Sequence, residues 1–290
     1  MTHVDLHCHS TASDGTYAPA DVVRLAAERK LSGLALTDHD TINGVAEAAE
    51  AAAELGIDFI PGIEISAEYA PGTMHILGYG VDPDSTVLRD LTATLLGGRD
   101  DRNPKIIAKL QELGVAITMD EVETEAKVEQ SEKKKPIGRP HIAAILLRKG
   151  YVSSIKQAFD KYLAPGGLAY FDKERLSPHT ALQMIHDSGG VSVLAHPVQL
   201  RYTNDAQLET LLKNLVDHGL GGIEVIHSDH DDKLVEQYTQ LARRFGLITT
   251  GGSDFHGSNK KDIDLGSARG RNVPRAFFDR LNDRIAARGK

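Results

Sequence analysis

Histidines and carboxylates recur at the ends of apolar segments along this chain, in a spacing that suits metal binding. The first segment reads Val-Asp-Leu-His-Cys-His over residues 4–9. Side chains alternate across a strand, so His7 and His9 would face one side while Cys8 faces the other. Imidazole nitrogens are common ligands of divalent metal ions. One such pair is a weak signal by itself, and the later segments strengthen it.

Further histidines and carboxylates follow the later apolar segments. Asp14 lies in the loop after the first segment, and the others contain or precede Thr37-Asp38-His39-Asp40, Glu64, His75, His196, Glu224 with His227, and Asp254 with His256. Nitrogen and carboxylate ligands without thiolate suit Mn²⁺, Fe²⁺ or Zn²⁺ in a catalytic site with open positions. The nine predicted metal ligands are His7, His9, Asp14, His39, Glu64, His75, His196, Asp254 and His256. Nine ligands are too many for one ion, so we expect two or three divalent ions, with Mn²⁺ favoured and Glu64 as the bridge.

The elements that must position these residues alternate between strand and helix patterns. Strands are predicted at 3–7, 33–37, 58–63, 74–79, 191–195, 222–226 and 247–251. Helices are predicted at 19–30, 43–55, 178–188, 205–218, 231–245 and 274–287. This alternation predicts an α/β fold in which a parallel sheet closes into a barrel. The carboxyl ends of all strands in such a barrel open onto one face, where the candidate ligands would meet.

Residues 96–172 break this alternation. They show helical patterns at 103–113, 119–127, 140–149 and 154–163 and no convincing parallel strand, and Gly97-Gly98 and Pro165-Gly166-Gly167 predict the links. We therefore expect two domains. Residues 1–95 together with 173–290 form the metal-binding barrel, and residues 96–172 form a small helical insertion that caps the substrate.

Composition restricts the cellular compartment and the kinds of partner that we expect. The formal net charge of −8 disfavours nonspecific binding of duplex nucleic acid. A single cysteine, Cys8, excludes an internal disulfide and fits a reducing compartment. No apolar run approaches the ~20 residues needed to span a bilayer. We expect a cytoplasmic protein without a membrane partner, and its oligomeric state is left open.

Five short motifs contain most of the candidate ligands. They read Asp-Leu-His-Cys-His-Ser at 5–10, Leu-Thr-Asp-His-Asp at 36–40, Gly-Ile-Glu-Ile-Ser at 62–66, Ala-His-Pro at 195–197 and Ser-Asp-Phe-His at 253–256. In this order they resemble the motifs of the polymerase and histidinol phosphatase (PHP) family of metal-dependent phosphoesterases. The resemblance implies a distorted, TIM-like (β/α)₇ barrel with a site for up to three ions.

The same resemblance implies a division of the ligands among three ions. His7, His9, Glu64 and Asp254 would hold the first ion, Glu64, His75 and His196 the second, and Asp14, His39 and His256 the third. Asp38 and Asp40 would then support the ligands, because ligating histidines usually need an oriented partner.

Within the family, the chain is most similar to small proteins that have a helical insertion and act on nucleotide phosphates. This likeness rests on Met-His-Ile-Leu-Gly-Tyr at 74–79, Ile-Gly-Arg-Pro-His at 137–141 and Lys-Tyr-Leu at 161–163. Arg139 and His141 at the start of a helix would suit a phosphate, although Arg139 could instead make a structural salt bridge. Predicted substrate-binding residues are Arg139, His141, Lys161 and His230, and Tyr162, Tyr170 or Phe171 could stack on a base.

The function expected from this likeness is a metal-dependent phosphoric ester hydrolase. Bound metals lower the pKa of water and so supply hydroxide as the nucleophile. The leading substrate is a nucleoside 3′,5′-bisphosphate. Asp254, His196 and His227 are the predicted catalytic residues, and His196, His227 or His230 would assist the leaving alkoxide.

Four alternatives remain open. The chain could be a 5′–3′ exonuclease on short 5′-phosphorylated oligonucleotides or a histidinol phosphatase. Hydrolysis of an amide or lactam is disfavoured because that chemistry commonly uses a carbamylated lysine at a strand end, and none is present there. A noncatalytic, polymerase-associated metal module fits poorly with a chain that has no attached polymerase segments.

Overall fold

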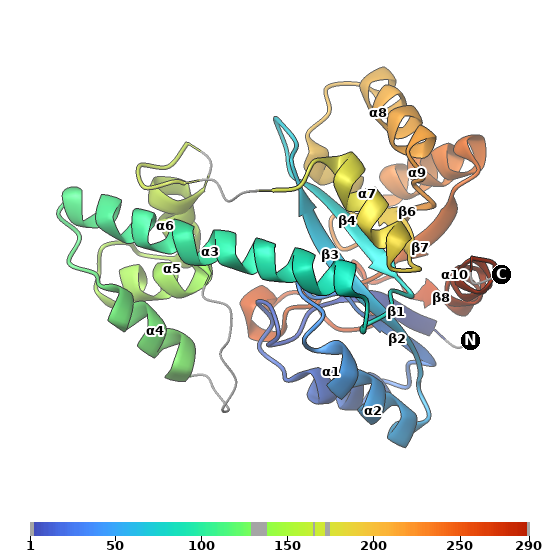
Figure 1. Ribbon diagram of the computed structural model, residues 1–290, viewed down its shortest axis with the longest axis horizontal. Helices are drawn as coiled ribbons and strands as arrows, with labels where there is room; N and C mark the ends of the chain where they lie inside the picture. The colour runs from blue at the N-terminus through green and yellow to red at the C-terminus, as the bar shows by residue number, and fades with distance from the viewer. Residues whose placement is uncertain (1–2, 129–137, 165, 172–174, 289–290) are drawn as a thin grey trace. The chain divides into compact units, whose positions relative to one another are not determined.

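Strands form at all seven predicted places and join one mixed sheet. The computed structural model describes residues 3–128, 138–164, 166–171 and 175–288. The strands are β1 (His3–Cys8), β2 (Gly33–Leu36), β3 (Asp58–Ala67), β4 (Met74–Tyr79), β5 (Val191–Leu194), β6 (Gly222–Ile226), β7 (Ile248–Gly251) and the additional two-residue β8 (Val273–Pro274) (Figure 1). Their order in the sheet is β7-β6-β5-β4-β3-β2-β1-β8.

The expectation of an all-parallel sheet is wrong at β4 and β8. Strand β4 runs antiparallel to β3 and to β5, and β8 runs antiparallel to β1. The short connection between β3 and β4 permits a hairpin, whereas a parallel crossover needs a dozen or more residues. Pairing with β4 also extends β3 to Ala67, so Glu64 lies within the strand and not after it. His75 is consequently opposite Ser66 in the hairpin.

The sheet is nearly closed into a barrel by contacts between β1 and the segment after β7. The Asp254 N–H donates to the His7 carbonyl at 2.8 Å, and the His9 N–H donates to the Phe255 carbonyl at 2.9 Å. This close approach requires Gly252, because a Cβ at that position would collide with the backbone nitrogen and Cβ of His7. The nearly closed barrel confirms the predicted α/β barrel class.

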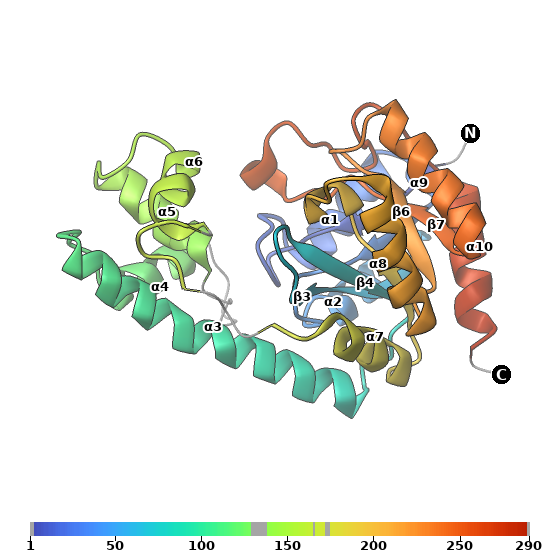
Figure 2. The ribbon, with the colours of Figure 1, turned by 90° about the horizontal axis from the view of Figure 1, so that it is seen from above.

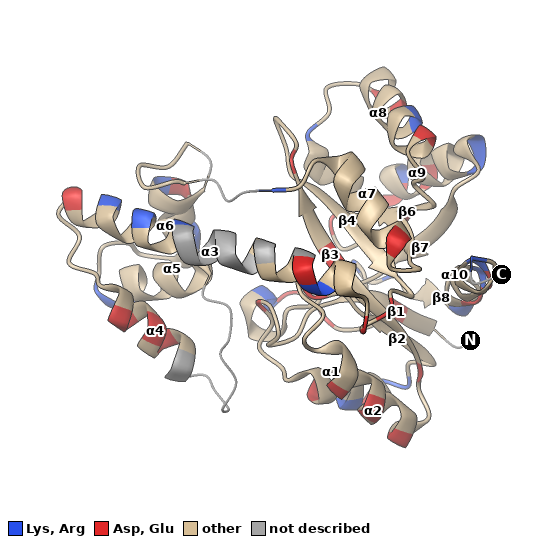
Figure 3. Cartoon of the chain, in the orientation of Figure 1, with Lys and Arg blue, Asp and Glu red and all other residues tan. Residues whose placement is uncertain are grey.

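Helices cover the outside of this barrel. They are α1 (Pro19–Glu28), α2 (Val45–Leu55), α7 (Pro178–Asp187), α8 (Asp205–Asp217), α9 (Asp232–Phe245) and α10 (Arg275–Ala286), while the short helices η2 (Pro197–Leu200) and η3 (Gly257–Lys260) follow His196 and His256. Helices α9 and α10 lie beside β6 and β7 (Figure 2). Both acidic and basic residues lie on α8 and α9 (Figure 3), and an ion pair of Arg244 with Glu209 joins the two helices.

An apolar cluster beneath α1 and α2 fixes the first βα units. It contains Val22, Val23 and Leu34, all fully buried, together with Cys8. The Cys8 thiol donates to the Ala35 carbonyl at 3.3 Å. Cys8 therefore packs on the face of β1 opposite His7 and His9, as the alternation of the strand requires.

The chain divides into two compact units, residues 1–92 with 175–290 and residues 93–174. The second unit has its own core, in which Ile106, Ile142 and Leu163 are fully buried. Its helices are most of α3 (Thr86–Glu112), then α4 (Met119–Val128), α5 (Arg139–Arg148), α6 (Ile155–Ala158) and the π-helix η1 (Phe159–Leu163). No helix in the described part of the chain is long and apolar enough to span a membrane.

The predicted link at Gly97-Gly98 is wrong, because α3 continues through both glycines. A glycine in a helix costs about 1 kcal/mol relative to alanine, and the hydrogen bonds of a 27-residue helix offset that cost. The predicted link at 165–167 is described only in part, since Pro165 lies outside the described residues.

Substitution of Gly252 by alanine should strain the closure of the barrel. Overpacking of this kind costs roughly 1–3 kcal/mol, which corresponds to a fall of about 2–10 °C in the thermal unfolding midpoint. The control is Gly138→Ala, where φ is −124° and the nearest atom to an added Cβ is Cδ of Pro140 at 3.2 Å. Equal midpoints for the two variants would contradict this role of Gly252.

Candidate metal centre

The buried side chain of His7 lies between two carboxylates. Its Nδ1 is 3.0 Å from Oε1 of Glu224 on β6, and its Nε2 is 3.3 Å from Oε2 of Glu64 on β3. A carboxylate that accepts the Nδ1 proton leaves the Nε2 lone pair available to a metal ion. Glu224 therefore orients His7 toward Glu64.

Glu64 is the carboxylate around which the other histidines gather. It is fully buried. Its Oε1 lies 2.8 Å from Nδ1 of His75 and 3.0 Å from Nε2 of His196. Its Oε2 lies 3.2 Å from Nε2 of His9 and 3.0 Å from Nδ1 of His39. The two oxygens thus face different rings, which is the geometry that a bridging ligand requires.

Asp254 also uses its two oxygens differently. Its Oδ1 lies 3.3 Å from Nε2 of His9 and 3.4 Å from Nδ1 of His256. Its Oδ2 lies 3.3 Å from Nε2 of His227 and forms an ion pair with Lys260. The backbone at Asp254 is left-handed, with a φ of +60°, a conformation that aspartate tolerates better than most residues.

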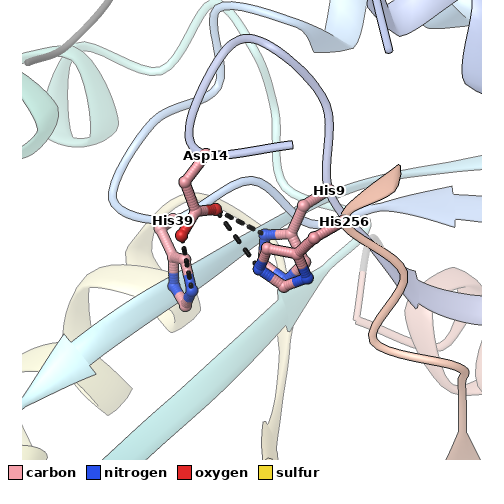
Figure 4. Close-up of side chains that lie close together, drawn as sticks. All are labelled: His9, Asp14, His39 and His256. Atoms are coloured by element: carbon pink, nitrogen blue, oxygen red, sulfur yellow. Dashed lines mark ion pairs between the residues drawn. The ribbon is translucent and has the colours of Figure 1, made fainter. Parts of the chain in front are cut away.

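A fourth group lies at the more exposed side of the centre and is drawn in Figure 4. Oδ1 of Asp14 is 3.3 Å from Nε2 of His256 and 3.9 Å from Nδ1 of His9, and Oδ2 is 4.0 Å from Nε2 of His39. The rings of His9 and His256 stack with their centroids 4.0 Å apart. The side chain of Asp14 is 36% exposed, so solvent and substrate can approach here.

These distances fit shared metal ions. Two ligand atoms bound to one ion at about 2.1 Å lie about 3.0 Å apart at a right angle and about 3.4 Å apart at a tetrahedral angle. The nitrogen–oxygen distances around Glu64 Oε2 run from 3.0 to 3.3 Å. Among the described residues, Nε2 of His7, Nε2 of His9 and Oε2 of Glu64 are buried with no hydrogen-bond partner. Buried polar atoms are rarely left so, and a cation among them would satisfy all three.

Every predicted ligand belongs to at least one group that could hold an ion. The groups are His9, Asp14, His39 and His256; His7, Glu64 and His196; His7, His9 and Asp254; His39, Glu64 and His75; and His7, Glu224 and His227. Their ligand atoms lie within 4.8 Å of one another in each group. Because the groups share His7, His9, His39 and Glu64, they describe one polynuclear centre.

The buried charges of the centre depend on one another. Burial alone would raise the pKa of Glu64, but the rings of His39 and His75 lower it well below its ordinary value. Burial would likewise raise the pKa of Glu224, and His7 lowers it to about 2. Both carboxylates are therefore ionised at neutral pH and need a positive charge close by.

Three further aspartates each accept from both the N–H and the hydroxyl of a serine, and Asp38 also accepts from the Ser13 hydroxyl at 2.6 Å. The pairs are Asp5 with Ser253, Asp38 with Ser10, and Asp40 with Ser66, at 2.6 to 3.2 Å. These aspartate–serine clamps join neighbouring strand ends: Ser10 follows His9, and Ser253 precedes Asp254. Asp38 thus holds His9 through the adjacent Ser10, whereas Asp40 holds Ser66, which lies opposite His75 in the β3–β4 hairpin.

His227 and His230 lie on the β6 side of the centre. The N–H of Asp229 donates to Nδ1 of His227 at 3.0 Å, so the proton of the neutral ring is on Nε2, which faces Asp254. Nδ1 of His230 lies 3.0 Å from the Val225 carbonyl and therefore holds the proton. Burial lowers the pKa of His230 to about 4, and its Nε2 remains an acceptor.

The predicted phosphate-binding residues Arg139, His141 and Lys161 lie in the second unit. The Arg139 guanidinium donates to the Leu163 carbonyl at 2.8 Å and lies over the ring of Tyr170. Nδ1 of His141 accepts from the Gly138 N–H and so caps α5.

Base stacking by Tyr162 is a wrong expectation. Only 6% of this residue is exposed, because its ring belongs to the core of the second unit.

Glu224 was noted beside His227 but not assigned as a ligand, and Lys260 was absent from the predicted site. Glu224 stands on the same strand as Val225 and precedes His227 by three residues, a pattern that could have indicated its role. Lys260 follows His256 by four residues, but two adjacent lysines in a polar segment carry no sequence signal that one of them contacts Asp254.

Comparison with known proteins gives a consistent result. A model described as the PHP domain matches residues 5–246. The chain is 36% identical over 267 residues to a 3′,5′-nucleoside bisphosphate phosphatase of Chromobacterium violaceum, covering 92% of this chain and 91% of that protein. It is 34% identical over 252 residues to a 5′-3′ exoribonuclease of Haemophilus influenzae, covering 87% and 89%.

Two further matches extend this comparison. The chain is 35% identical over 256 residues to a phosphoribosyl 1,2-cyclic phosphate 1,2-diphosphodiesterase of Eggerthella lenta, covering 87% of this chain and 94% of that protein. A solved structure of an amidohydrolase from Chromobacterium violaceum, with bound sulfate and no metal, superposes with a TM-score of 0.84 at 34% identity and covers 98% and 97% of the two chains.

Replacement of Glu64 by glutamine should cost the centre at least one ion. The amide keeps the size of the side chain but loses its negative charge. The affinity for Mn²⁺ should therefore fall by more than the 10–100-fold typical of residues that only support a ligand. Metal analysis after dialysis and calorimetric titration with Mn²⁺ measure this effect. The control is Glu68→Gln, an exposed position four residues along the chain. Full metal content in Glu64→Gln would refute the bridging role.

Replacement of Asp38 by asparagine should break one clamp. An amide cannot accept from the N–H and the hydroxyl of Ser10 with both of its terminal atoms, and a buried unsatisfied group costs about 1–3 kcal/mol. We expect a lower thermal midpoint than that of Asp283→Asn, an exposed control on α10. Indistinguishable midpoints would show that the clamp contributes nothing to stability.

Proposed function

Since this chain belongs to the PHP domain family and is a metal-dependent phosphoesterase, we propose that it removes phosphate from a nucleoside 3′,5′-bisphosphate. The observation that carries this proposal is the polynuclear centre gathered around Glu64, open on the side of Asp14. The relative with this activity aligns with 92% of the chain, so the similarity includes both units. The substrate is a small phosphorylated nucleotide.

The proposed ligands are the nine side chains named above, and they would hold two or three divalent ions. Mixed imidazole and carboxylate ligation suits Mn²⁺, which we favour, as well as Fe²⁺ and Zn²⁺. When bound, such ions make water acidic enough to provide a nucleophile at neutral pH and offset negative charge on a phosphoryl group. Glu224 and the aspartate–serine clamps keep the ligands in position for that chemistry.

Among the residues proposed to assist the leaving alkoxide, the contacts favour His227. The Asp229 N–H fixes the proton of its ring on Nε2, at the centre. His196 faces Glu64 through Nε2 and is better placed as a ligand. His230 presents an acceptor. We therefore propose Asp254 and His196 as metal-holding catalytic residues and His227 as a hydrogen-bond donor that stabilises the leaving oxygen through Nε2–H.

The helical unit is proposed to bind the rest of the nucleotide. Arg139 and Lys161 bring positive charge, and the ring of Tyr170 lies 5.5 Å from the Arg139 guanidinium carbon. A guanidinium beside an aromatic ring suits a phosphate next to a base. His141 acts as a helix cap in this proposal and has a supporting role.

A second candidate function is 5′–3′ cleavage of short 5′-phosphorylated oligonucleotides. The exoribonuclease of Haemophilus influenzae is 34% identical, against 36% for the bisphosphate phosphatase and 35% for the cyclic phosphate diesterase. These identities are too similar to select a substrate. Direct comparison of substrates decides among them.

Phosphate release by the Mn²⁺-loaded protein should be fastest with a nucleoside 3′,5′-bisphosphate. The comparison substrates are 5′-phosphorylated di- to pentanucleotides, a ribose 1,2-cyclic phosphate 5-phosphate and histidinol phosphate at equal concentration. Accumulation of mononucleotides from the oligonucleotides would show that the protein is an exonuclease. Turnover of histidinol phosphate alone would overturn the nucleotide proposal.

The variant Asp254→Asn should reduce turnover at least 1,000-fold, roughly the loss of 4 kcal/mol of transition-state stabilisation. Its matched control is Asp262→Asn, an exposed aspartate eight residues further along the chain. Retention of more than a tenth of the rate in Asp254→Asn would remove Asp254 from the catalytic centre.

A further inference from the structure

Lys260 brings a positive charge to the edge of the metal centre. Its ammonium group forms an ion pair with Oδ2 of Asp254. The two partners differ in exposure: the Asp254 side chain is 6% exposed, whereas that of Lys260 is 37% exposed. Lys260 therefore connects the buried carboxylate with solvent at the entrance of the centre.

The loop that positions Lys260 is fixed to the loop that contains Asp14. The Ser258 N–H donates to Oγ1 of Thr16 at 2.9 Å, and the Asn259 side-chain amide donates to the Asp14 carbonyl at 2.7 Å. Gly257 has a φ of +65°, and a Cβ there would collide with Oγ1 of Thr16. Lys260 is thus held in place by its backbone as well as by its ion pair.

Lys260 contacts Oδ2 of Asp254 and leaves Oδ1 free to face the histidines of the metal centre. Oδ1 of Asp254 faces the nitrogens of His9 and His256, whereas Oδ2 faces Lys260 and His227. An ion that Oδ1 and Nε2 of His9 would hold leaves Oδ2 to the ammonium group. Lys260 need not leave when the centre is loaded.

The ammonium group keeps hydrogen-bonding capacity for a ligand. It has three N–H donors, and among the described residues Asp254 is its one hydrogen-bond partner. Phosphoryl oxygens are strong acceptors, and lysine binds them as a point charge. The chain has a formal net charge of −8, so a phosphorylated substrate must be attracted by local positive charge.

We propose that Lys260 binds a phosphoryl oxygen of the substrate and that Asp254 positions its ammonium group for this contact. The proposal deepens the function proposed above and depends on it, because it assigns a phosphate-binding residue to the same centre. Lys260 would help to balance the negative charge that builds on the phosphoryl oxygens during hydrolysis.

Calorimetric titration of the Mn²⁺-loaded protein with inorganic phosphate tests this role. Lys260→Gln should weaken phosphate binding about tenfold or more, the loss of one charged hydrogen bond. Lys260→Arg should retain most of the binding. The matched control Lys261→Gln removes the same charge from the neighbouring exposed position and should bind phosphate and turn over substrate as the unchanged protein does.

Titration of the metal-free proteins with Mn²⁺ separates phosphate binding from a role in metal binding. We expect Lys260→Gln to bind Mn²⁺ at least as tightly as Lys261→Gln, since a competing cation near Asp254 is gone. Equal phosphate affinity in the two variants would overturn the proposal. A parallel loss of Mn²⁺ and phosphate affinity in Lys260→Gln, restored by arginine, would also overturn it.

Phosphate binding and nucleotide hydrolysis by the unchanged protein show which of the two proposals has failed. If it binds phosphate but hydrolyses none of the nucleotide substrates, the proposed function fails while Lys260 remains testable by phosphate binding. If it hydrolyses a nucleoside bisphosphate and Lys260→Gln matches Lys261→Gln, only the inference about Lys260 fails.

Discussion

The burial of the Glu64 carboxylate is the constraint on which the rest of the barrel interior depends. An isolated charge in a protein interior is strongly unfavourable, and it persists only where partners compensate it. Imidazole nitrogens from β1, β4 and the loops after β2 and β5 lie within 3.3 Å of its two oxygens. The neighbouring carboxylates raise the pKa of both His7 and His9, so protons and metal ions are alternative sources of the positive charge that Glu64 needs.

The backbone around the centre is shaped to keep this cluster together. The β3–β4 hairpin places His75 beside Glu64, and the contacts of β1 with residues 254 and 255 bring Asp254 to His7 and His9. The aspartate–serine clamps connect strand ends without using the ligands themselves. Left-handed backbone at Asp40, His196 and Asp254 shows where local strain is accepted, as is common at functional sites.

The strand positions, and the gathering of the candidate ligands at the strand ends, could be predicted from the sequence because both depend on local patterns. His7 and His9 follow from alternation along one strand, and Asp254 from its place after another. The antiparallel direction of β4 depends on how strands pair across the sheet, which the residues of 74–79 do not encode alone. The continuity of α3 through Gly97-Gly98 reflects the surrounding helix, and the role of Lys260 depends on a loop fold that brings it back to Asp254.

The pairing of β1 with the segment after β7 determines when the metal centre can form during synthesis and folding. Its candidate ligands span residues 7 to 256, so they cannot assemble until residue 256 has emerged and the loop between them has closed. During synthesis, the early histidines have no complete set of partners. Tight metal uptake is consequently a sign of finished folding, and a chain truncated before residue 254 would lack a ligand that no local rearrangement can replace.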